Sequence, residues 1–302
     1  MKELRIVSLL PAATEIVCAL GLRVRLVGRS HECDFPADVA GLPALTRARV
    51  DSALPSERLD QEVRRILAER LPLYMLDSAR LAELAPDVVV TQEACEVCAV
   101  SYDQVVTSLK RTAYRAAVVS LRPTRLGDVL DDVRKVASAC GIPEQGERVE
   151  GELRARLATV PEGAGAGPRP RVAVVEWLAP LMLAGHWVPE AIEAAGGVPV
   201  GPAAGAPSPY ATWEDLRALA PDAIVVAPCG FDLARTETEA EPWLASLRGL
   251  SPRILLADGN AYFNRPGPRI VEAVETLAGW LRGEPVPPER GRALEAGALS
   301  AR

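Results

Sequence analysis

The chain has 302 residues, and with 49% hydrophobic and 25% charged residues it has the composition of a globular protein. A net charge of −6 excludes the basic footprint of nucleic-acid-binding proteins, and no apolar run reaches the roughly 20 residues of a membrane-spanning helix. We therefore expect no nucleic-acid partner and no membrane insertion. A chain of this length exceeds the size at which a single hydrophobic core stops growing, which favours two domains.

The first half opens with an apolar run at residues 5–10, which predicts a strand. A helix ending near Gly21 should follow, with Thr14 as its N-cap. Pro11 and Glu15 interrupt the apolar character, so the start does not resemble a signal peptide. If Met1 is the true start, the sequence predicts a cytoplasmic protein.

Further along, short strands are expected at residues 26–28, 88–90 and 118–121, with a loop and a charged helix between 34 and 71. Helical patterns cover residues 126–140 and 143–160, and a stretch rich in Gly, Ala and Pro at 161–170 predicts a linker. The second half opens with another arginine-led apolar run at 171–175.

One phrase occurs in both halves. Residues 81–90 read LAELAPDVVV, and residues 216–226 read LRALAPDAIVV. Each copy predicts a helix end, a Pro-Asp turn and a buried strand. Two similar halves of alternating helices and strands indicate an α/β fold with parallel sheets, in which ligands bind beyond the carboxyl ends of the strands.

Four sets of residues resemble, in order and spacing, the helical-backbone family of substrate-binding proteins, which deliver metal ions, siderophores, haem and corrinoids to ABC transporters. These sets are residues 5–15, residues 30–36, the Leu-Ala-Pro-Asp phrase of both halves, and residues 265–270. The resemblance implies two Rossmann-like lobes with parallel sheets, joined by a long helix and holding the ligand in a cleft between the lobes. It implies an N-terminal lobe at 1–122, a helical connector at 123–168, a C-terminal lobe at 169–283 and a flexible tail at 284–302.

Within that family the loops are most similar to those of the vitamin B12-binding members. The resemblance therefore implies non-catalytic binding of a corrinoid (cobalamin-like) ligand or a related metal chelate. His31 stands where those members offer a tyrosine to the corrin, and Gln92 stands where they offer a tryptophan. Glu214 matches the second-lobe glutamate that docks on the transporter permease, whereas the first-lobe position reads Ala79.

The residues expected at the ligand come from the strand-end loops and from the family alignment. They are Pro11, Ala12, Thr14, His31, Glu32, Gln92, Trp177, His186, Trp187, Phe231, Phe263 and Arg265. Among these, the aromatic side chains would supply apolar walls, Arg265 would hold a polar or anionic periphery, and His31 would approach the metal axially.

A second set of loop residues could bind a metal ion directly. Cys95 and Cys98 have the two-residue spacing with which two thiolates hold one metal, and this spacing also fits redox chemistry or two structural cysteines. Together with His31, Cys33 and Cys229 they form a set of soft ligands suited to zinc, ferrous iron, cobalt or copper(I).

Three functions remain open from the sequence, and none of them is enzymatic, because no nucleophile elbow, phosphate-binding loop or dinucleotide fingerprint is present. The first is a cytoplasmic chelate-binding protein. The second is a metalloprotein that binds a divalent ion through its Cys and His loops for sensing or redox work. The third is a conventional ABC transporter component whose true start lies upstream.

Overall fold

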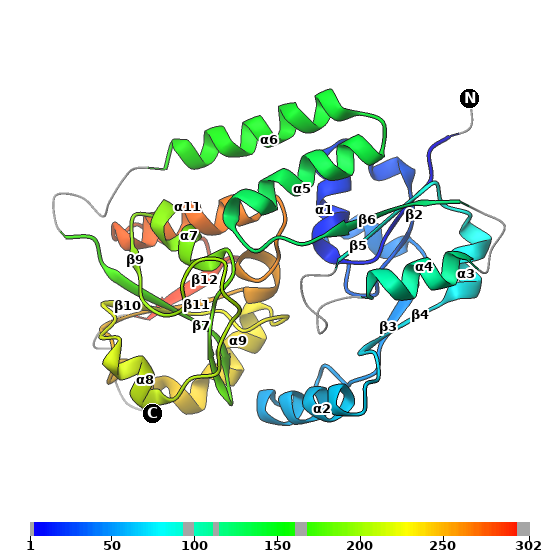
Figure 1. Cartoon of the computed structure of the whole chain (residues 1–302). Helices are drawn as coiled ribbons and strands as arrows, with labels where there is room; N and C mark the ends of the chain where they lie inside the picture. Colours follow the sequence, from blue (N-terminus) through cyan, green and yellow to red (C-terminus); the bar gives the residue numbers. More distant parts are fainter. Residues whose placement is uncertain (1–2, 93–99, 111–114, 161–167, 295–302) are drawn as a thin grey trace. The chain divides into compact units, whose positions relative to one another are not determined.

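The computed structural model describes residues 3–92, 100–110, 115–160 and 168–294, and the chain divides into two compact units (Figure 1). Unit 1 takes in the chain up to Leu54, Arg58–Pro123 and Asp128–Leu153. Unit 2 takes in Pro55–Glu57, Thr124–Gly127 and the chain from Arg154 onward. No helix in the described part of the chain combines the length and apolarity that crossing a bilayer requires.

Unit 1 is built on a parallel sheet with the strand order β2-β1-β5-β6. Its strands are β1 (Ile6–Ser8), β2 (Leu26–Arg29), β5 (Val88–Gln92) and β6 (Ala117–Leu121). A separate antiparallel pair consists of β3 (Thr46–Ala48) and β4 (Tyr74–Leu76). The helical elements are α1 (Pro11–Ala19), η1 (Arg23–Arg25), η2 (Ala37–Gly41), α2 (Ser56–Ala68), α3 (Ser78–Leu84), α4 (Tyr102–Lys110), α5 (Leu126–Ala139) and α6 (Pro143–Ala158).

Unit 2 is built on a mixed sheet with the strand order β12-β11-β10-β7-β8, in which β9 also pairs with β7. Its strands are β7 (Arg171–Leu178), β8 (Leu181–Leu183), β9 (Val198–Pro199), β10 (Ala223–Val226), β11 (Arg253–Ala257) and β12 (Gly291–Leu294). The helical elements are α7 (Val188–Ala194), α8 (Trp213–Ala218), α9 (Leu233–Ala240), η3 (Glu241–Trp243), α10 (Leu244–Arg248), η4 (Gly259–Phe263) and α11 (Ile270–Leu281). The expected α/β fold with two Rossmann-like lobes is confirmed: the unit 1 sheet is parallel, the unit 2 sheet is parallel except for its edge strands β8 and β12, and the long helix predicted at 143–160 is α6.

The repeated phrase makes the same contacts in both units. In unit 1 the backbone N–H of Arg5 donates to Asp87 Oδ2 at 3.0 Å, and the Arg5 side chain donates to Leu84 O at the end of α3. In unit 2 the backbone N–H of Arg171 donates to Asp222 Oδ2 at 2.8 Å, and its side chain donates to carbonyls just beyond α8. The arginine and the Pro-Asp turn therefore tie the start of the first strand of each unit to the end of the helix that precedes the neighbouring strand, α3 before β5 and α8 before β10.

Two expectations about element ends are wrong. Helix α1 begins at Pro11 with Leu10 as its N-cap, so Thr14 lies inside the helix instead of capping it. Proline is favoured in the first helical turn because its missing N–H would have no partner there. The predicted flexible tail at 284–302 contains a strand, because β12 pairs antiparallel with β11 and forms an edge of the sheet. As an edge strand, β12 needs no alternating apolar pattern, which is why composition did not reveal it.

Helices α5 and α6 run side by side (Figure 1) and touch at a glycine. A Cβ on Gly146 would lie 2.5 Å from the Cβ of Ala137 and 3.3 Å from the Cα of Arg134, both on α5. Gly151, on the same helix, is exposed and has nothing within 4 Å of such a Cβ. The close approach of the two helices therefore depends on Gly146.

We predict that Gly146→Ala lowers the free energy of unfolding by about 1–3 kcal/mol, because the added methyl group overpacks the contact with α5. Gly151→Ala should raise it by about 0.5–1 kcal/mol, because alanine is the better helix former where there is room. Urea unfolding followed by circular dichroism measures both. Equal effects of the two substitutions would contradict the close helix contact.

Candidate functional site

His31 follows the carboxyl end of β2 in unit 1, and its imidazole is fixed by a threonine. The ring Nδ1 lies 2.7 Å from Oγ1 of Thr46, the first residue of β3. The backbone N–H of His31 donates to the same oxygen at 3.0 Å, and Ser30 Oγ lies 3.0 Å from it. All three of these atoms thus belong to the loop after β2, and β3 supplies the oxygen that they share.

The surroundings of His31 favour a neutral imidazole. Burial lowers the pKa of His31, and the nearby guanidinium of Arg29 lowers it further. The Tyr74 ring lies 5.7 Å from the imidazole, and its hydroxyl donates to Glu32 Oε1 at 2.9 Å. A neutral imidazole is the form in which histidine binds metals.

The other predicted site residues of α1 and its neighbouring loop are part of the core. Ala12, Thr14 and Cys33 are buried, and Pro11 is half-buried. The Thr14 hydroxyl lies 2.8 Å from Ser8 Oγ and 2.9 Å from Cys33 Sγ. The Cys33 sulfur is thus engaged inside unit 1.

The expected metal set of soft ligands is not assembled among the described residues. In that part of the chain no three His, Cys, Asp or Glu side chains come close enough to hold a metal ion. Cys95 and Cys98 lie outside the described residues. Cys229 is half-buried in unit 2, where its backbone N–H donates to the carbonyl of Glu176.

In unit 2 the end of β7 carries an aromatic pair. Trp177 is half-buried, and its ring centroid lies 5.0 Å from that of Phe231. The indole N–H is shared between the carbonyls of Ala179 and Ser56, at 3.0 and 3.2 Å. Phe231 is fully buried, with the Arg235 guanidinium 3.6 Å from its ring centroid. The orientation of the Trp177 ring is therefore fixed by its hydrogen bonds and by its packing against the buried Phe231 ring.

His186 and Trp187 occupy a strained loop after β8. His186 has a φ of +52°, a conformation that costs energy in a non-glycine residue and recurs at functional sites. Its ring is stacked on that of Trp187 at 5.7 Å, and burial lowers its pKa. A Cβ on Gly185 would collide with the carbonyl of Ala206, so residue 185 must be a glycine for its backbone to pack against that of residues 206 and 207.

The remaining predicted site residues differ in exposure. Trp187 donates its indole N–H to Phe263 O at 2.9 Å, and Phe263 itself is buried. Arg265 is only 4% exposed and donates to Asn260 Oδ1 at 3.0 Å. Gln92 ends β5 and is buried, whereas Glu214 lies exposed in the first turn of α8.

Sequence reasoning missed Glu176, which lies on β7 next to Trp177. The pairing of β7 with β8 shifts register between Val175 and Trp177, so Glu176 occupies a bulge at the carboxyl end of the strand. Ser208 Oγ donates to Glu176 Oε2 at 2.8 Å and accepts the Gly185 N–H. Burial raises the pKa of Glu176 to about 7, although the bond from Ser208 acts in the opposite direction. Bulges commonly redirect a side chain next to a functional site.

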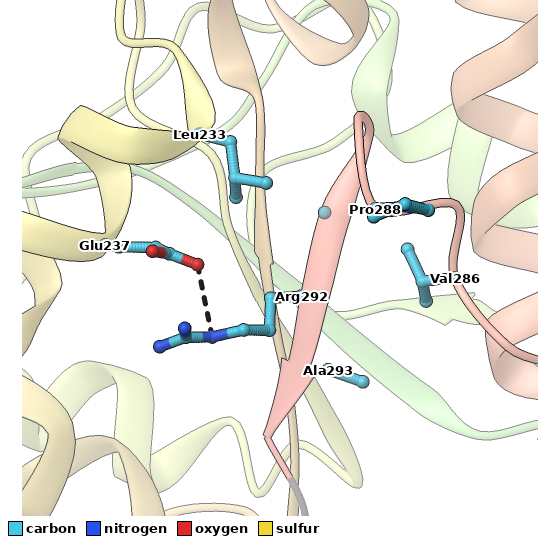
Figure 2. A pocket seen from close by; sticks show the side chains of 7 residues that line it. Leu233, Glu237, Val286, Pro288, Arg292 and Ala293 are labelled. Carbon is cyan, nitrogen blue, oxygen red and sulfur yellow. Dashed lines mark ion pairs between the residues drawn. The ribbon is translucent and has the colours of Figure 1, made fainter.

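A shallow depression lies elsewhere in unit 2, between α9 and β12 (Figure 2). It is lined by Leu233, Glu237, Val286, Pro288, Gly291, Arg292 and Ala293. Glu237 Oε1 and Arg292 Nε form an ion pair across it at 3.1 Å. It contains none of the residues expected at the ligand.

We predict that Glu176→Gln makes the protein less sensitive to pH. Since the folded-state pKa lies above that of an unfolded glutamate, ionisation opposes folding, and stability falls as the pH rises from about 4.5 towards 7. At about pH 8 the variant should be more stable than the parent by about 1–2 kcal/mol, after allowance for partial exposure. Urea unfolding from about pH 5 to pH 8 measures this difference.

The matched control is Glu193→Gln, which changes an exposed glutamate of α7. It should leave the slope of stability against pH as it is in the parent. If Glu176→Gln behaves in the same way as this control, the elevated pKa of Glu176 is wrong.

Known proteins share this fold over nearly the whole chain. The vitamin B12-binding protein of Vibrio cholerae is 22% identical over 280 residues, which cover 92% of this chain and 89% of that protein. The crystal structure of the periplasmic vitamin B12 binding protein of Vibrio cholerae matches with a TM-score of 0.64 at 19% identity, covering 92% of this chain and 96% of that one. The structure of a periplasmic heme binding protein from Pseudomonas aeruginosa matches with a TM-score of 0.71 at 20% identity, covering 97% and 99%.

The solved relatives are periplasmic by name, so the cytoplasmic location expected from the sequence finds no support among them. The family model described as periplasmic binding protein matches residues 6–241, which include strands and strand-end loops of both units. The chain belongs to the periplasmic binding protein family.

Proposed function

We propose that this protein binds a corrinoid, or a closely related planar metal chelate, without transforming it, and passes it to an ABC transporter. The observation that carries the proposal is the state of His31, whose Nδ1 is held by Thr46 and whose pKa is lowered. Histidines that bind metals commonly engage their second ring nitrogen with an oxygen in this way. A histidine at a strand end of unit 1 is thus prepared for the metal of a chelate.

Unit 2 supports the same ligand class through its rings. Trp177 and Trp187 are half-buried, and each has its N–H engaged by backbone carbonyls, so their orientations are fixed. Flat aromatic surfaces suit a macrocycle. The relatives named above bind vitamin B12 or haem, which are both macrocycles with a metal at the centre.

The proposed role in transport rests on the family and on one exposed carboxylate. Glu214 lies in the first turn of α8, beside a capping box formed by Thr212 and Asp215. The capping box holds that helix start rigid, which suits a docking group that meets arginines of a permease. Since members of such families bind and release their ligands, we propose a non-enzymatic, exported binding protein.

The test is an anaerobic absorption titration of the reduced, metal-stripped protein with hydroxocobalamin and, separately, with haemin, each followed by desalting. We expect cobalamin to co-elute with the protein and to show a shifted band, because the His31 imidazole replaces the exchangeable axial water. In His31→Ala the band shift should be lost.

His186→Ala is the matched control, since it changes the other of the two histidines of the chain. It should preserve the band shift. Retention of haemin but not of cobalamin would overturn the corrinoid assignment and leave a haem-binding protein. Complete separation of both colours from the protein would overturn chelate binding itself.

A further inference from the structure

We infer that Thr46 is the positioning residue for His31: its hydroxyl holds Nδ1, so that Nε2 is the nitrogen presented to the metal of a bound chelate. The inference rests on the proposed function for the identity of the ligand. The geometry behind it lies within unit 1, between the loop after β2 and the first residue of β3.

Among the described residues, the Thr46 hydroxyl makes its hydrogen bonds with one short segment, residues 30 and 31. Its Oγ1 lies 2.7 Å from His31 Nδ1, 3.0 Å from the His31 backbone nitrogen and 3.0 Å from Ser30 Oγ. Thr46 and Ser30 are buried, 7% and 2% exposed, so water does not replace these bonds readily. One oxygen therefore fixes both the backbone and the ring of His31.

The hydroxyl groups of Thr46 and Ser30 can form a chain of hydrogen bonds to the His31 ring in two arrangements, which differ in the ring nitrogen that holds the proton. A hydroxyl has one proton and two acceptor positions, and the His31 backbone N–H occupies one of the latter. In one arrangement Ser30 donates to Thr46, Thr46 donates to Nδ1, and the ring proton is on Nε2. In the other, Nδ1–H donates to Thr46 and Thr46 donates to Ser30, which leaves the lone pair on Nε2.

Rotation of two hydroxyl groups, together with the shift of the ring proton, interconverts the arrangements without moving a heavy atom. Ser30 Oγ can accept from Thr46 while it also accepts the Glu32 backbone N–H, at 3.3 Å. A metal at Nε2 selects the second arrangement, because the ligand nitrogen must be unprotonated. The hydroxyl pair thus keeps Nδ1 satisfied both with and without the metal.

The ring is also held from its side. The Tyr74 ring lies 5.7 Å away at an interplanar angle of 47°, and Tyr74 is itself tied to Glu32 through its hydroxyl. Within the described residues Nε2 makes no hydrogen bond. Thr46 and Tyr74 therefore restrain the imidazole and leave Nε2 as the nitrogen that can take a ligand.

The test compares Thr46→Val, which removes the hydroxyl at nearly constant size, with Thr46→Ser, which restores it. The first readout needs no ligand: nitrogen-15 NMR of the His31 ring in the apo protein. We expect the Nδ1 signal to change in Thr46→Val and to return to that of the parent in Thr46→Ser. A packing effect of the methyl group would show the opposite order, with a change in Thr46→Ser and none in Thr46→Val.

The second readout uses hydroxocobalamin, whose cobalt(III) is diamagnetic. In the parent complex the proton should be found on Nδ1. The affinity of His31 for the cobalt is read from the shifted absorption band. Thr46→Val should lower this affinity by about 10–100-fold, as is usual for loss of a group that hydrogen-bonds to a metal ligand, and Thr46→Ser should stay close to the parent.

The outcomes separate the two hypotheses. If the parent binds neither hydroxocobalamin nor haemin, the proposed function fails, and the metal-presenting role of Thr46 fails with it. If the parent binds cobalamin through His31 but Thr46→Val leaves both the ring signals and the affinity unchanged, the proposed function survives and the role of Thr46 is overturned. A metal-bound form with the proton on Nε2 would also overturn it.

Discussion

Both units depend on a contact in which an aspartate that follows a proline accepts a backbone N–H from the start of the first strand. Asp87 and Asp222 make this contact, and in each unit the arginine at the strand start also donates to carbonyls at a helix end. The helix ends leave carbonyls that need donors, and the arginines supply them. The strands at the centre of each sheet are thereby aligned, and the loops at their opposite ends follow from that alignment.

Those loops are held by close backbone packing rather than by large side chains. Gly185 packs against the carbonyl of Ala206, and Gly259 packs against the backbone of residues 227 and 228, where a Cβ would collide. Asn264 donates to Ala227 O at 2.7 Å, which ties the turn after β11 to the end of β10. In unit 1, the hydroxyls of Ser30 and Thr46 have the corresponding role around His31. Preorganised groups of this kind lower the entropy cost of ligand binding.

The sequence was sufficient for the architecture and for several positions of the site, because both depend on local patterns. The repeated Leu-Ala-Pro-Asp phrase predicted two α/β units, and the strand-end rule selected His31, Trp177 and His186. It could not reveal Thr46, since β3 is a three-residue strand without alternation and its contact with His31 spans 15 residues of chain. Glu176 was missed because a bulge, which sequence periodicity does not report, decides where its carboxyl group lies. The burial of Thr14, Phe231 and Arg265 likewise follows from tertiary packing.

The position of β12 has a consequence for the synthesis of the chain. Residues Gly291–Leu294 complete the sheet of unit 2 by pairing with β11, whereas all four strands of the unit 1 sheet lie within the first 121 residues. A nascent chain can therefore assemble the first sheet while the ribosome is still adding the second half. The second sheet keeps an open edge on β11 until translation has passed residue 294 and that strand has emerged. Over that interval the unpaired edge of β11 is open to pairing with strands of other chains.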